Sequence, residues 1–206
     1  VFSVPFIHLF VAVSKFSKIS RRQLEKVAGI LVLVIAVSVF SYGTYNAYSP
    51  VVRTYDVDLT NQSAGKKKEI NIVMAADTHF GMISNKRHAE QMVKEINALK
   101  PDLVLFPGDI VDDEVESYSE QGIAKVISNI KSTYGVYVSL GNHDLGDTAE
   151  LIDILHAGNM KVLYDETVVI ADSLTLVGRK DKYDRERMSL AELMKGVDQE
   201  KPIILL

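Results

Sequence analysis

The chain has 206 residues, of which 47% are apolar and 24% charged, so it holds enough apolar side chains to bury a core. A formal net charge of −4 argues against a general nucleic-acid binder, and no nucleic-acid partner is expected. The absence of cysteine excludes disulfides and thiolate metal sites and leaves Asp, His, Asn or Glu as ligands of any metal ion.

The N-terminal quarter has the pattern of a membrane protein. Residues 1–13 are apolar but too short to span a bilayer, and we interpret them as the tail of a truncated transmembrane helix, with a peripheral or core segment as the alternative. Residues 14–26 carry five cations and are predicted to form a basic cytoplasmic loop. Residues 27–49 are uncharged and predicted to form a transmembrane helix that ends before Pro50, with a buried core helix as the alternative.

This charge distribution predicts that the rest of the chain lies on the extracytoplasmic side of the cell membrane. The run Ser20-Arg21-Arg22-Gln23-Leu24 also resembles a twin-arginine export signal, so a cleaved signal remains an alternative to a permanent anchor. Both alternatives place the C-terminal part outside the cytoplasm.

After a linker over residues 50–68, strand and helix patterns alternate through residues 69–206. Short apolar runs predict strands, and apolar residues at helical spacing predict helices between them. The predicted strands are 69–76, 103–106, 136–140, 162–164, 168–170 and 174–177, and the predicted helices are 86–99, 123–130 and 148–157. This order predicts an α/β fold with a largely parallel sheet and sites at the carboxyl ends of its strands.

Three polar motifs follow the first three predicted strands at steps of about 32 residues. They are Asp77-Thr78-His79, Gly108-Asp109-Ile110-Val111-Asp112 and Gly141-Asn142-His143-Asp144. Because the ends of neighbouring parallel strands meet at one sheet edge, these hard oxygen donors and imidazoles are expected to assemble a dinuclear metal site.

The residue types suggest individual roles. Asp77 and His79 could converge on one ion, and Asp109 could bridge two cations after the tight turn that Gly108 allows. Asn142 offers a neutral carbonyl oxygen and His143 an imidazole. Asp144 could orient that imidazole or stabilise its charge.

The three motifs resemble the first three signature blocks of the calcineurin-like metallophosphoesterases, and the anchor plus domain is similar to bacterial membrane-associated members. The resemblance covers residues 70–206, to which Gly178-Arg179-x-Asp181 and the apolar run 202–206 add weaker similarity. It implies a metallophosphoesterase α/β/β/α sandwich, here incomplete.

The resemblance implies that Asp77, His79 and Asp109 bind the first metal, with Asp109 bridging, and that Asn142 binds the second. It implies that His143 contacts the phosphate and stabilises the transition state or protonates the leaving oxygen, with Asp144 as its partner. Asp112 is expected to fix a neighbouring ligand or loop, with an exposed loop acid as the alternative. Two divalent metal ions (Mn, Fe or Zn) would activate a water for attack on a phosphoester.

The resemblance also implies three further histidine ligands, which no residue here supplies; His88 and His156 fall on predicted helices. The first residue is Val, and residues 203–206 are typical of an interrupted strand, so we interpret the chain as a fragment at both ends. We expect the 206-residue chain to bind metal weakly and to lack phosphoesterase activity. The alternative for the whole protein is a non-catalytic binding module, and the membrane location suggests a lipid-linked or cell-envelope phosphoester as substrate.

Overall fold

The computed structural model describes residues 20–58, 69–112 and 115–206. The chain divides into two compact units, of which the first ends at Thr54 and the second covers Tyr55–Leu206. The predicted helix tail at 1–13, residues 14–19 of the predicted loop and residues 59–68 of the predicted linker lie outside the described residues.

The first unit contains one long helix, α2 (Arg21–Ala47). It begins at a capping box in which the Ser20 side chain accepts from the backbone N–H of Gln23 while the Gln23 side chain accepts from the backbone N–H of Ser20. It therefore starts six residues before the predicted span, and Arg21, Arg22 and Lys26 are helical rather than in a loop. Among the residues that the structure describes, α2 alone is long and apolar enough to cross a membrane.

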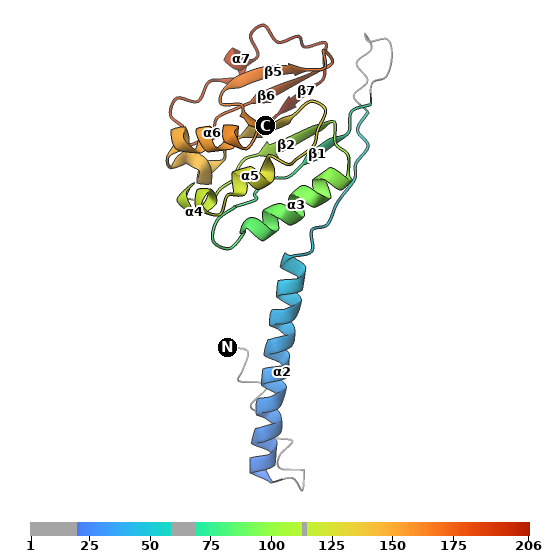
Figure 1. The fold of residues 1–206 in the computed structure, drawn as a ribbon, viewed down its shortest axis with the longest axis vertical. Helices are drawn as coiled ribbons and strands as arrows, with labels where there is room; N and C mark the ends of the chain where they lie inside the picture. Colours follow the sequence, from blue (N-terminus) through green and yellow to red (C-terminus); the bar gives the residue numbers. More distant parts are fainter. Residues whose placement is uncertain (1–19, 59–68, 113–114) are drawn as a thin grey trace. The chain divides into compact units, whose positions relative to one another are not determined.

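The second unit is built on a four-stranded parallel sheet in the order β1-β2-β3-β4 (Figure 1). Its strands are β1 (Ile72–Met74), β2 (Leu103–Pro107), β3 (Val136–Ser139) and β4 (Met160–Val162). The register pairs Met74 with Leu105 and Pro107 with Ser139, so the carboxyl ends of the first three strands lie at one edge. The predicted parallel α/β core is confirmed.

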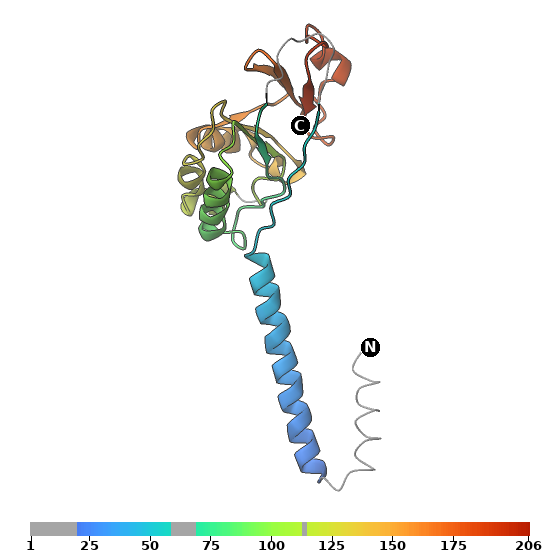
Figure 2. The same cartoon turned by 90° about the vertical axis from the view of Figure 1, so that its right-hand side faces the viewer.

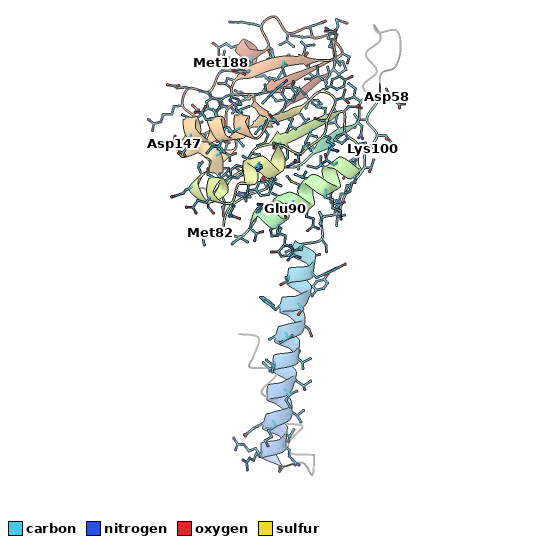
Figure 3. All side chains as sticks on the ribbon, viewed as in Figure 1. Asp58, Met82, Glu90, Lys100, Asp147 and Met188 are labelled. Atoms are coloured by element: carbon cyan, nitrogen blue, oxygen red, sulfur yellow. The ribbon has the colours of Figure 1, made fainter. Side chains whose placement is uncertain are left out.

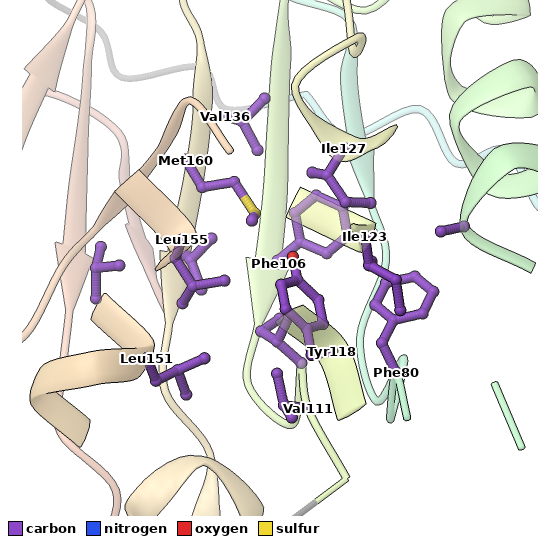
Figure 4. Packing of buried hydrophobic residues seen from close by; sticks show 14 of the residues in the cluster. Phe80, Phe106, Val111, Tyr118, Ile123, Ile127, Val136, Leu151, Leu155 and Met160 are labelled. Atoms are coloured by element: carbon purple, nitrogen blue, oxygen red, sulfur yellow. The ribbon is translucent and has the colours of Figure 1, made fainter. Parts of the chain in front are cut away.

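Helices cover one face of this sheet. Because alternate residues of a strand point to opposite sides, only every second strand residue packs against these helices. Val104 and Phe106 of β2 and Val138 of β3 face a core that the helices close. Figure 4 shows Phe106 among the side chains of this core. The buried Tyr118 and Phe80 pack in the same cluster with ring centroids 6.2 Å apart. The helices are α3 (Lys86–Ala98), α4 (Val115–Glu120), α5 (Ile123–Ile127) and α6 (Thr148–Ala157).

A second sheet packs on the other face, as the perpendicular view shows (Figure 2). The side chains of Leu103, Leu105 and Tyr137 point to the opposite face of the parallel sheet. There they form a second core with Leu174 and Leu176 of the second sheet. This sheet has the order β5-β6-β7, with β5 antiparallel and β7 parallel to β6. Its strands are β5 (Glu166–Ile170), β6 (Leu174–Gly178) and β7 (Ile203–Leu205), and the single-turn α7 (Leu190–Leu193) precedes β7.

The layers are therefore helix, sheet and sheet, with α7 as the helix in the second sheet's part of the chain. Element boundaries differ from prediction where packing decides them. The strand predicted over 69–76 is three residues long, the helix predicted over 123–130 ends at Ile127, and α4 was not predicted. Tyr118 explains α4, because its ring is fully buried and, with the partly buried Val115, packs this short helix against the core although the helix has no visible periodicity.

Candidate metal centre

The three motifs occupy the loops that leave the carboxyl ends of β1, β2 and β3. Beyond the strands, these loops continue to hydrogen-bond to one another. The backbone N–H of Asp77 donates to the carbonyl of Gly108 (3.3 Å), and that of His79 donates to the carbonyl of Asp109 (3.0 Å). The first two motifs are thus held side by side by the same ladder that pairs their strands.

The backbone at the predicted ligands is unusual. Asp77, His79 and Asp109 have φ angles of 52°, 42° and 51°, in the left-handed region that non-glycine residues seldom adopt. Each such residue is strained by about 1–3 kcal/mol, and the strain persists only where the surroundings determine the conformation. The ligand atoms of these three side chains lie close to a common point.

That common point carries two overlapping groups of candidate metal ligands. Asp77, His79 and Asp109 each offer a ligand atom, and these atoms all lie within 4.8 Å of one another. The same spacing holds for a second group of His79, Asp112 and His143. Oxygen and imidazole donors at this spacing fit a divalent transition metal, so the donor chemistry of the site suits the expected cofactor.

The third motif is joined to the second through Asp109. The backbone N–H of His143 donates to Oδ1 of Asp109 at 3.0 Å, while Oδ2 of Asp109 lies 4.0 Å from Nε2 of His79. A Cβ on Gly141 would lie 2.2 Å from Oδ1 of Asp109, a distance at which real atoms do not coexist. Glycine at position 141 therefore permits the close approach of the two loops.

His143 and Asn142 lie in the short 3-10 helix η1 (Asn142–Leu145). The ring of His143 meets that of His79 edge-on, with centroids 4.8 Å apart and an interplanar angle of 82°. Asn142 is exposed at the start of η1, next to the cluster in sequence. His143 also belongs to the second ligand group, and its predicted contact with a phosphate stays a prediction.

Asp144 forms hydrogen bonds with the backbone of two loops. Its carboxylate is buried and accepts from the backbone N–H groups of Ile110 (3.0 Å), Val111 (3.0 Å) and Gly141 (2.9 Å). The hydrogen bonds of this carboxylate go to backbone and not to the imidazole of His143, because η1 directs the Asp144 side chain inward. Burial raises the pKa of this carboxyl, and the three backbone donors oppose that shift. Asp144 therefore joins the second and third loops through its carboxylate, and its predicted pairing with His143 stays a prediction.

Asp112 lies beside the imidazole of His79, and its role in fixing a neighbouring ligand or loop stays a prediction. Its Oδ1 lies 3.7 Å from Nδ1 of His79, on the side of the ring away from the nitrogen that faces Asp109. A carboxylate there fixes the orientation of a metal-binding imidazole. The two histidines that were not expected to be ligands lie on helices, His88 in α3 and His156 at the end of α6. Neither belongs to a ligand group in the described ranges.

Comparison with known proteins identifies similar sequences. The sequence model of the calcineurin-like phosphoesterases matches residues 70–199. An uncharacterized metallophosphoesterase of Helicobacter pylori is 31% identical over 144 residues, which are 68% of this chain and 38% of that protein. A transmembrane protein with metallophosphoesterase domain from Danio rerio is 25% identical over 225 residues, which cover 98% of this chain and 51% of the length of that protein. The chain thus spans 38% and 51% of the length of these two relatives.

Proposed function

The chain belongs to the calcineurin-like phosphoesterase family, and on that premise we propose that its natural protein is a membrane-anchored, metal-dependent hydrolase of phosphoesters. The observation that carries the proposal is the convergence of Asp77, His79 and Asp109, with ligand atoms within 4.8 Å of one another at the ends of β1 and β2. A non-catalytic scaffold would have no need to keep Asp77, His79, Asp109, Asn142 and His143 together.

The proposed division of labour follows the geometry. Asp77, His79 and Asp109 would hold one divalent cation, and Asp109 with Asn142 would contribute to a second; Mn, Fe or Zn suits these donors. When bound, the cations would supply an activated water and neutralise phosphoryl oxygens. His143 would contact the phosphate and donate a proton to the leaving oxygen or stabilise the charge that develops on the phosphoryl group.

Membrane attachment forms part of the proposal. The helix α2 is long enough to span a bilayer, and a relative of similar sequence is named a transmembrane protein. Because cations precede the apolar run and none lies within it, we place the phosphoesterase domain on the extracytoplasmic side. A lipid-linked or cell-envelope phosphoester is then the substrate class within reach.

The test is Mn²⁺-dependent hydrolysis of bis(p-nitrophenyl) phosphate and p-nitrophenyl phosphate by the natural protein that carries this sequence. Substituting Asp77→Asn or Asp109→Asn should lower kcat/KM by about a hundredfold or more, because each removes a charged ligand. Asp153→Asn, an exposed acid on α6, is the matched control and should leave the rate unchanged. Saturating metal with no turnover of either ester would favour the non-catalytic binding module.

A further inference from the structure

A turn directly after the metal-ligand cluster exposes two large apolar side chains. Residues 81–84 connect the first motif to α3, and Met82 and Ile83 at the tip of this turn are 82% and 83% exposed. Met82 is labelled in Figure 3. They are the two most exposed large apolar side chains that the structure describes in the domain that starts at residue 69. Two adjacent side chains of this kind need a reason, because each would be stabilised by leaving water.

The turn is well determined by its contacts. The backbone N–H of Gly81 donates to the carbonyl of Ser84 at 3.0 Å, and the side chain of Gln121 donates to the carbonyl of Gly81 at 2.9 Å. Gly81 itself is buried against Asp112, whose Cβ would lie 3.2 Å from a Cβ added to the glycine. The fold thus holds the apolar tip outward, and the base of the turn packs against the residue that faces His79.

Cations lie next to this tip. Lys86 and Arg87 are exposed at the start of α3, whose first turn contains no acidic residue. Asn85 caps the helix by accepting from the backbone N–H of Arg87 at 3.0 Å, which fixes where both cations begin. Apolar side chains flanked by Lys and Arg are typical of protein segments that enter the boundary between lipid headgroups and acyl chains.

We propose that the turn over residues 81–84 docks on an anionic lipid bilayer, with Met82 and Ile83 entering the acyl boundary and Lys86 and Arg87 meeting the headgroups. The occupant is a bilayer because the same chain carries α2, which is long and apolar enough to cross one. A connection of the 24 residues between Ala47 and Ile72 can reach at most about 80 Å, which limits how far the domain can be from that bilayer. Docking would hold the metal-ligand cluster at headgroup level, where a lipid-linked phosphoester lies. The inference rests on the proposed anchoring by α2 and does not require turnover.

The chain contains no tryptophan, so a single introduced indole reports on its own surroundings. We would reconstitute the Ile83→Trp chain in vesicles of phosphatidylcholine with phosphatidylglycerol. Its emission should shift to the blue and be quenched by brominated acyl chains. Val169→Trp, at a half-exposed position on β5, is the matched control and should remain accessible to aqueous acrylamide.

Lys86→Gln combined with Arg87→Gln should lower the ratio of docked to undocked turn by about fivefold for each cation removed. Omitting phosphatidylglycerol should have a similar effect on the Ile83→Trp chain. Equal acrylamide quenching of the two tryptophans in anionic vesicles would overturn the proposal, and circular dichroism would verify that both variants are folded. Flotation of the unsubstituted chain with vesicles tests the anchor separately, so failure of the anchor and failure of the docking turn are distinguished.

Discussion

Gly141→Ala should damage the candidate metal centre without replacing any candidate ligand. The added Cβ would lie 2.2 Å from Oδ1 and 2.5 Å from the backbone nitrogen of Asp109, whereas ordinary contact begins near 3.4 Å, so Oδ1 would have to retreat by about 1.2 Å. The nitrogen cannot follow freely, because the carbonyl of Asp109 accepts from the N–H of His79. Overpacking of this kind destabilises a fold by about 1–3 kcal/mol.

The same displacement breaks the hydrogen bond from the N–H of His143 to Oδ1 of Asp109 and moves that carboxylate out of the ligand group. We therefore expect Mn²⁺ affinity, measured by electron paramagnetic resonance, to fall by about 10–100-fold. Urea denaturation in detergent, followed by circular dichroism, measures the loss of stability.

Gly122→Ala is the control for that substitution. Gly122 has a φ angle of 66° and open space around its Cβ position, so alanine there strains the backbone by about 1 kcal/mol and meets no neighbour. Mn²⁺ affinity should stay at the wild-type value. Unchanged affinity and stability in Gly141→Ala would refute the close approach of the two loops.

Asp144→Asn should destabilise the domain by about 1.5–3 kcal/mol in urea, because an amide cannot accept from all the backbone groups that the carboxylate binds; wild-type stability would show that these hydrogen bonds are unimportant. Burial and the hydrogen bond to Asp184 raise the pKa of Tyr164 to about 12, so the difference between wild type and Tyr164→Phe in an alkaline absorbance titration should show a transition near that pH and none near the ordinary value of 10. The same hydrogen bond lowers the pKa of Asp184 in the folded state. The stabilisation that this bond gives is therefore complete at pH values above the ordinary pKa of 3.8, and it disappears as the pH falls through the lower pKa of the folded protein. In Tyr164→Phe the acid-induced loss of stability should be smaller, and an unchanged acid limb would exclude this link. The 206-residue chain alone should hydrolyse neither aryl phosphate with Mn²⁺, and robust metal-dependent turnover would contradict the expectation that further ligands are needed.

The long-range pattern of the fold was predictable because it depends on periodicity. Alternation of strands and helices predicted the parallel sheet, and the even spacing of the motifs predicted that they meet at one edge. The local boundaries were not predictable in the same way. The charge of Arg21 and Arg22 suggested a loop, whereas the capping box at Ser20 starts the helix there. In β1 the regular strand register ends at Met74, although the backbone N–H groups of Ala75 and Asp77 still donate to the carbonyls of Leu105 and Gly108.

Most residues of the candidate site could be identified in the sequence from their types, but their backbone conformations could not be predicted. Nothing in a single sequence specifies that Asp77, His79 and Asp109 adopt left-handed conformations, since these depend on hydrogen bonds between loops far apart in the chain. Proximity in sequence to His143 suggested a pair with Asp144, whereas the backbone hydrogen bonds of the Asp144 carboxylate follow from the inward direction of η1, which the sequence did not show. The Gly141 contact likewise depends on the position of Asp109.

The left-handed backbone at Asp77, His79 and Asp109 sets stability against the placement of candidate metal ligands in this domain. Glycine at any of the three would relieve strain of about 1–3 kcal/mol, so a search for more heat-resistant variants should select these positions early. Each such gain would delete a candidate metal ligand. The domain therefore cannot be optimised for heat resistance and for ligand placement at the same residues, and improved stability must be found in the core or at the helix ends.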